Sequence, residues 1–152
     1  MGEGRNALYL AQQGWQVTGV DIADQALAHA QQRAQRLGCQ LTTIEQDADT
    51  YDWGIKEWDL IVLCYADERA HVAQVQAALK PGGLLVFENF HTDINQLRPA
   101  ASGQQIGFGT DELKKLYAAA AFQIVRYEEP VGVADFSKEQ HRLVRLVARK
   151  PE

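Results

Sequence analysis

Apolar residues along the chain alternate between helical and strand spacing, with glycine or proline at many of the junctions. Residues 23–37 carry leucine and alanine at helical spacing, and Gly38 follows where a helix commonly ends in a left-handed residue. Residues 60–65 (LIVLCY) form a continuous apolar run, as expected of a strand that helices cover on both faces. The pattern predicts an α/β fold built on a mostly parallel sheet.

The junctions give the expected order of elements. Thr110 is expected to cap the helix that follows it, and the basic residues of 142–150 are expected on the solvated face of an edge strand. Residues 91–109 are polar and unusually long for a connection, which favours a functional lid. The pattern predicts helices over residues 5–13, 23–37, 68–79 and 111–121, and strands over residues 16–20, 41–45, 60–65, 84–90, 122–129 and 142–149.

Length and composition narrow the class of protein. The 152 residues, 46% hydrophobic and 23% charged, predict one soluble globular domain over residues 1–152. No apolar run approaches the ~18 residues of a membrane span, and the net charge of −5 argues against a nucleic-acid partner. Two cysteines, no apolar leader and no His/Cys metal spacing predict a cytoplasmic protein without a metal site.

A glycine-containing motif opens the first helix. Gly2 and Gly4 can bring the backbone close to a ligand, and Asp21 follows Gly2 at about the spacing that places an acid on a ribose hydroxyl. Together with Ala7 the glycines also satisfy the dinucleotide pattern, so NAD is one possible ligand. The competing interpretation is a frayed terminus followed by an acid that caps the next helix.

Four stretches of the chain carry a family pattern: MGEGRNALYLAQQGWQVTGVDIA, IEQDAD, WDLIVLCYADERAHVAQVQAALKPGGLLVFENF and VADFSKEQHRLVRLVARKP. Through them the whole chain resembles the class I S-adenosylmethionine-dependent methyltransferases, in particular their tellurite-resistance-type group. The first stretch is specific, the LKPGG turn is common to many methyltransferases, and the last stretch is moderately specific. The resemblance implies a Rossmann-like, doubly wound and mostly parallel sheet with an antiparallel C-terminal strand.

The resemblance implies a cofactor role for eight residues. Gly2 and Gly4 match the loop beside the methionine part of S-adenosylmethionine. Asp21 matches the acceptor of both ribose hydroxyls, and Ile22 matches a residue beside adenine. Asp47 and Ala48 match the pair that hydrogen-bonds to adenine, and Cys64 and Tyr65 match the strand end that borders the methyl donor. Two of these have plainer interpretations, since Asp47 could be a solvated loop acid and Cys64 a small buried hydrophobe.

Three further residues are candidates for the substrate site. His91 follows Glu88 and Asn89 at the carboxyl end of a predicted strand, where open α/β sheets bind ligands. Arg5 and Asn6 are expected to point toward the same rim. No catalytic residue is assigned, because methyl transfer from a sulfonium rests mainly on alignment and exclusion of water.

The order of elements departs from the family at its start. Relatives place a strand that ends in an acidic residue before Gly2, whereas a helix comes first here. We therefore expect the domain to lack its first, central strand at the N-terminal side, with Met1 an internal residue of a longer product. A genuine truncation would weaken cofactor binding or require a strand from a second subunit in a homodimer.

The sequence thus predicts S-adenosylmethionine-dependent methyl transfer to a small-molecule acceptor, such as a chalcogen oxyanion or a thiol. Two alternatives remain open. The chain could be an inactive methyltransferase-like module for binding or dimerisation, or an NAD-dependent oxidoreductase.

Overall fold

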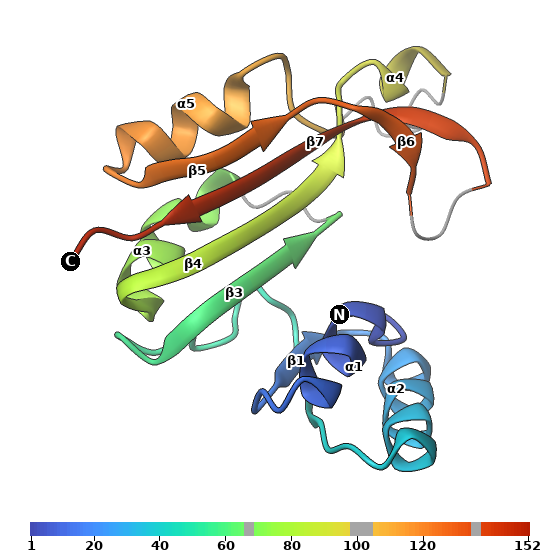
Figure 1. Ribbon diagram of the computed structural model, residues 1–152. Coiled ribbons are helices and arrows are strands. Elements are labelled where there is room, and N and C mark those ends of the chain that lie inside the picture. Colours follow the sequence, from blue (N-terminus) through green and yellow to red (C-terminus); the bar gives the residue numbers. More distant parts are fainter. Residues whose placement is uncertain (66–68, 98–104, 135–137) are drawn as a thin grey trace. The chain divides into compact units, whose positions relative to one another are not determined.

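The computed structural model describes residues 1–65, 69–97, 105–134 and 138–152. Its contacts divide into two compact units, Met1–Asp52 and Trp53–Glu152 (Figure 1), and we describe each by itself. Both units combine helices with strands, which confirms the predicted α/β class. The expectation of one domain over the whole chain stays a prediction.

In the first unit, two parallel strands are joined by a helix. β1 (Thr18–Asp21) pairs with β2 (Thr42–Glu45), and α2 (Asp24–Leu37) connects them, while α1 (Arg5–Gln12) precedes both strands. The apolar stripes of the two helices are buried, at Ala7, Leu8, Leu27, Ala30 and Ala34. Because the strands are parallel, their carboxyl ends meet at one edge of the sheet.

The second unit is built on a mixed sheet with the order β3-β4-β7-β5. β3 and β4 are parallel, and β7 runs antiparallel to both of its neighbours, as predicted for the last strand. Figure 1 shows β4 and β7 as the two long central strands. The strands are β3 (Trp58–Cys64), β4 (Leu79–Phe90), β5 (Gln123–Glu128), β6 (Val131–Val133) and β7 (Gln140–Arg149), and the helices are η1 (Arg69–His71), α3 (Val72–Ala78), α4 (Ile94–Leu97) and α5 (Glu112–Ala119).

One face of this sheet forms the core of the second unit. Alternate residues of β4 are fully buried against α3 and α5, and their neighbours on the other face are only half-buried. The Phe87 and Phe108 rings pack edge to face with 5.3 Å between their centroids, and the Tyr117 and Phe122 rings pack in the same geometry. The buried cluster includes Ile61, Val75, Leu79, Leu85, Leu113, Val144, Leu146 and Ala148.

The predicted edge strand at residues 142–149 is wrong. β7 lies between β4 and β5, so both of its backbone edges are paired. Two of its arginines are ion-paired, Arg145 with Glu88 of β4 and Arg142 with Glu129, whereas Arg149 is exposed. The sequence predicted a solvated face for all of these basic residues, but two of them contact carboxylates from other segments.

The predicted capping role of Thr110 is also wrong. Asp111 occupies the N-cap of α5 with a φ of 57°, and no side chain there donates or accepts a capping hydrogen bond. The carboxylate of Glu112 instead reaches back and accepts a 2.7 Å hydrogen bond from the Gly109 backbone. The hydroxyl of Thr110 instead lies within hydrogen-bond distance of His91 and Arg142.

Two smaller differences concern element ends. β4 begins at Leu79 rather than at residue 84, and β6 was not foreseen. Residue 68 of an expected helix and residues 98–104 of the expected lid lie outside the described residues. Within the described ranges, no helix has the length and hydropathy needed to cross a bilayer.

Candidate functional site

Asp21 closes β1 and gathers backbone hydrogen-bond donors. The N–H of Gly2 donates to Oδ2 at 2.6 Å, the N–H of Ala23 donates to Oδ1 at 3.0 Å, and the amino group of Met1 donates to Oδ2 at 2.7 Å. Burial acts to raise the pKa of Asp21, but these bonds outweigh it and hold the pKa at about 2. The side chain is therefore an ionised acceptor at neutral pH.

Gly2 and Gly4 both have left-handed backbones, with φ of 55° and 79°. A Cβ at Gly4 would lie 3.0 Å from the Cβ of Ala30 on α2, which is tighter than ordinary contact. Glycine therefore lets the chain turn closely past α2 before α1 begins. The first two residues of that helix pair with each other, as Arg5 donates a 3.1 Å hydrogen bond to the Asn6 side chain.

A turn after β2 brings the other predicted adenine residues to the same sheet edge. The backbone N–H of Gln46 donates to the Asp21 carbonyl at 3.1 Å, which fixes the turn beside the end of β1. Asp47 accepts the N–H of Asp49 on its side chain at 3.0 Å, so Ala48 sits inside a tight loop. Ile22 follows Asp21 with its side chain 70% exposed. The structure thus gathers Asp21, Ile22, Asp47 and Ala48 in the first unit.

In the second unit, Cys64 and Tyr65 stand where β3 ends. Cys64 lies opposite Glu88 of β4 in the register, and the Tyr65 N–H donates to the Glu88 carbonyl at 2.9 Å. Cys64 is half-buried. Tyr65 has a φ of 58°, which is rare for a bulky side chain. Strain of this kind often marks a functional position.

The Tyr65 side chain is held by a carboxylate that an arginine also binds. Its hydroxyl donates a 2.5 Å hydrogen bond to Oε1 of Glu88, and Nε of Arg145 donates to Oε2 at 2.5 Å. Arg145 also lies 3.5 Å from Glu128 on β5. The Glu88 carboxylate raises the pKa of Arg145 above its usual value. Glu88, Arg145 and Glu128 lie opposite one another in the register of β4, β7 and β5.

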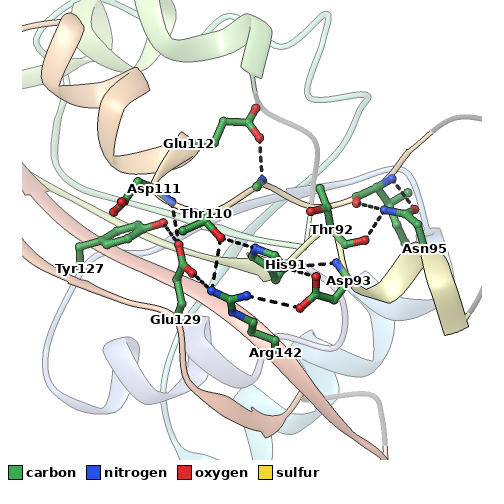
Figure 2. A network of polar contacts seen from close by, with 12 residues as sticks. His91, Thr92, Asp93, Asn95, Thr110, Asp111, Glu112, Tyr127, Glu129 and Arg142 are labelled. Carbon is green, nitrogen blue, oxygen red and sulfur yellow. Dashed lines mark hydrogen bonds and ion pairs between the residues drawn. The ribbon is translucent and has the colours of Figure 1, made fainter.

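His91 is buried and both of its ring nitrogens have partners (Figure 2). Nε2 lies 3.1 Å from the hydroxyl of Thr110, while Nδ1 lies 3.2 Å from the Asp93 backbone nitrogen and 3.0 Å from its carboxylate. Arg142 contacts the same threonine hydroxyl at 3.3 Å and Asp93 at 3.5 Å. The structure therefore places His91 in a network of its own unit, with its ring directed into that network.

Glu129 is the acidic centre at the other end of this network. It accepts hydrogen bonds from the Asp111 backbone at 2.8 Å, from the Tyr127 hydroxyl at 2.6 Å and from Arg142. Burial acts to raise the pKa of Glu129, but these donors outweigh it and lower the pKa. Burial, followed by the Glu129 contact, raises the pKa of Tyr127.

A second cluster fixes the chain around Gly107. Arg69 donates to Glu112 at 2.7 Å and to the Gly107 carbonyl at 2.6 Å, and its guanidinium lies 4.1 Å from the centre of the Phe108 ring. The Arg69 hydrogen bond lowers the pKa of Glu112 against a smaller effect of burial. Gly107 has a φ of 82°, and a Cβ there would overlap the Phe90 carbonyl.

Sequence reasoning missed the residues that organise these clusters. Arg145, Arg142, Tyr127 and Glu129 were assigned to strands without a polar role. One signal could have found Arg142 and Arg145, because arginines within an otherwise apolar strand require carboxylate partners wherever the strand lies inside a sheet. The facing residues become known only with the strand order.

The family described as a methyltransferase domain matches residues 1–83. The chain belongs to this methyltransferase family. Among curated relatives, Hemagglutinin 1 of Eikenella corrodens is 29% identical over 163 residues, which cover 99% of this chain and 52% of that protein. The chain thus spans about half the length of that relative.

Several solved structures share the fold of this chain. An S-adenosylmethionine-dependent methyltransferase from Methanosarcina mazei gives a TM-score of 0.80 at 20% identity, over 99% of this chain and 89% of that one. TehB from Haemophilus influenzae gives 0.78 at 20% identity, over 98% and 55%. The N-methyltransferase NodS from Bradyrhizobium japonicum, solved with S-adenosylhomocysteine, gives 0.73 at 21% identity, over 99% and 74%. These likenesses confirm the Rossmann-like methyltransferase fold.

Proposed function

We propose that this protein binds S-adenosylmethionine and transfers its methyl group to a small-molecule acceptor. The observation that carries the proposal is the ionised Asp21 carboxylate at the end of β1, held by the backbone of a glycine turn, in a chain of the methyltransferase family. Carboxylates at this end of a parallel strand suit ribose hydroxyls. The NodS complex supports the choice of cofactor.

The donor set of the first unit fits the adenosine part of this cofactor. Oδ1 of Asp21 accepts one described hydrogen bond, from Ala23, and a carboxylate oxygen can accept two. We assign the ribose to Asp21 and the adenine to Ile22, Asp47 and Ala48. Ile22 offers an exposed apolar surface to a base, and Asp47 offers a carboxylate to its amine.

Gly2 and Gly4 are assigned to the methionine part of the cofactor. Their left-handed backbones permit a close approach that a side chain would block. Cys64 and Tyr65, at the end of β3, are assigned to the methyl-donor end, because ligands of open α/β sheets bind at strand carboxyl ends. The bound cofactor supplies a methyl group on a positively charged sulfur.

The acceptor is proposed to be a small soft nucleophile, such as a chalcogen oxyanion or a thiol. The likeness to TehB and the resemblance to the tellurite-resistance-type group support this choice. Such acceptors require little proton transfer, so catalysis rests on alignment. Arg5 and Asn6 are the acceptor-side candidates of the first unit and His91 that of the second. We propose a cytoplasmic location for the same chemistry, in agreement with the low cysteine content.

Calorimetric titration with S-adenosylhomocysteine tests the proposal. We expect the wild-type protein to bind and Asp21→Ala to bind at least about tenfold more weakly, because a charge-assisted hydrogen bond is lost. The matched control is Asp24→Ala, which removes an exposed acid in the first turn of α2 and is expected to leave the affinity unchanged. An affinity that Asp21→Ala leaves intact would refute the assigned ribose site, and no binding by the wild type would refute the proposed cofactor.

A further inference from the structure

A cavity of about 410 Å³ lies in the first unit, away from the residues assigned to the cofactor. Its lining includes Gln16 and Gln40, which come shortly before β1 and β2 begin. Asp21 closes β1 at the opposite end, and a strand of this length spans roughly 10 Å. The cavity therefore lies at the amino ends of the two strands, whereas the proposed ribose site lies at their carboxyl ends.

Two helices reach the wall of this cavity with the same kind of ending. After α1, the N–H of Trp15 donates back to the Leu10 carbonyl at 3.1 Å, and after α2 the N–H of Cys39 donates back to the Ala34 carbonyl at 3.0 Å. Both turns pass through a left-handed glycine, with φ of 89° and 68°. This repeated geometry places Trp15 and Cys39 in the same cavity lining.

The electrostatic character of the cavity favours a cation. The carboxyl ends of both helices carry a partial negative charge, and the glutamines Gln12, Gln16 and Gln40 add amide oxygens to the lining. Among the described residues that line the cavity, none is Lys or Arg to pair with an anion, and none is Asp, Glu or His to hold a metal ion. The net charge of −5 also favours the approach of cations.

Two exposed apolar side chains narrow the kind of cation. Trp15 is 45% exposed and Leu37 is 48% exposed, and both line the cavity. Tryptophan has the aromatic ring that binds cations best. A quaternary ammonium ion suits these residues, because its methyl groups can pack on the indole and on leucine and it needs no hydrogen-bond acceptor.

We propose that this cavity binds a small quaternary ammonium compound, with the Trp15 ring as its principal contact and the ends of α1 and α2 supplying the complementary potential. Such binding goes beyond the proposed methyl transfer and uses none of the residues assigned to it.

Calorimetric titration of the whole chain with choline, at constant ionic strength, tests the proposal. The uncharged comparison ligand is dimethylbutanol, in which a tert-butyl group replaces the trimethylammonium group. We expect the wild type to bind choline and to bind dimethylbutanol at least about fivefold more weakly. Trp15→Leu should weaken choline binding about fivefold, and Trp15→Phe, which keeps a weaker aromatic ring, should weaken it less.

The matched control is Tyr9→Leu, because Tyr9 is an exposed aromatic residue of α1 outside the cavity lining. We expect this variant to keep the wild-type affinity for choline. Leu37→Lys leaves the indole in place and suits a helix carboxyl end, so it should fold and weaken choline binding by charge repulsion.

Three results would overturn the proposal: no binding of choline by the wild type, equal binding of the charged and uncharged ligands, or an affinity that neither Trp15→Leu nor Leu37→Lys changes. None of them bears on the titration with S-adenosylhomocysteine, so the proposed function stands or falls separately.

Discussion

Nε of Arg69 donates a 2.7 Å hydrogen bond to Oε1 of Glu112, 43 positions further along the chain. The same guanidinium binds the Gly107 carbonyl and covers the Phe108 ring. One arginine after β3 therefore fixes both the start of α5 and the turn that precedes it. The contacts join segments that no local sequence pattern connects.

Replacing Arg69 should destabilise the second unit. Arg69→Met keeps the apolar stem and removes the ion pair, the carbonyl contact and the cation–π contact, so we expect the free energy of unfolding to fall by about 1–2 kcal/mol. Urea denaturation measures the change. The control is Lys80→Met, which removes the exposed Lys80–Asp59 pair and should alter stability by less than about 0.5 kcal/mol. Equal effects of the two variants would contradict the role given to Arg69.

The depressed pKa of Glu112 predicts a loss of stability in acid. Its pKa is lower in the folded protein than the ordinary 4.5, so the unfolded chain takes up this proton first as the pH falls. The stabilisation is complete above about pH 4.5 and is lost as the pH falls toward the folded pKa.

Glu112→Gln isolates this contribution. The variant cannot take up that proton, so its unfolding free energy should decline less steeply with acid than that of the wild type. Denaturant midpoints measured between pH 3 and pH 7 provide the comparison. Parallel declines in the two proteins would show that other carboxylates account for the acid response.

Gly107 should tolerate no side chain. A Cβ there meets the Phe90 carbonyl and must also adopt a φ of 82°, so Gly107→Ala should cost on the order of 2–3 kcal/mol. Gly14→Ala is the matched control, because Gly14 has a φ of 89° with nothing within 4 Å of the added methyl group. Thermal unfolding should therefore separate the backbone strain common to both from the clash at Gly107 alone.

The sequence predicted the elements better than it predicted their neighbours. The apolar spacing of residues 23–37 and the apolar run of residues 60–65 gave α2 and β3 nearly as observed, because burial of one helix stripe or of a whole strand leaves a local signal. The glycine turn and Asp21 were also visible, because their chemistry depends on residues that are close along the chain or at a fixed spacing.

The side-chain partners were not visible in the same way. Threonine is favoured at helix N-caps, but the Thr110 hydroxyl lies between His91 and Arg142, which are distant in sequence. Glu88 and Arg145 are 57 positions apart and meet only because β7 lies beside β4. Local propensity has no access to strand order, so these contacts required the fold.

The place of β7 in the sheet has a consequence for synthesis. β5 leaves the ribosome before β7, yet its described partner in the sheet is β7, which also pairs with β4. Until residues 140–149 emerge, β5 cannot join the sheet, because β7 is the strand that links it to β4. The arginines that pair with Glu88 and Glu129 have also not yet been synthesised. The nascent second unit therefore carries an unfinished sheet and unbalanced carboxylates, and its cooperative folding waits for the strand translated last among those described.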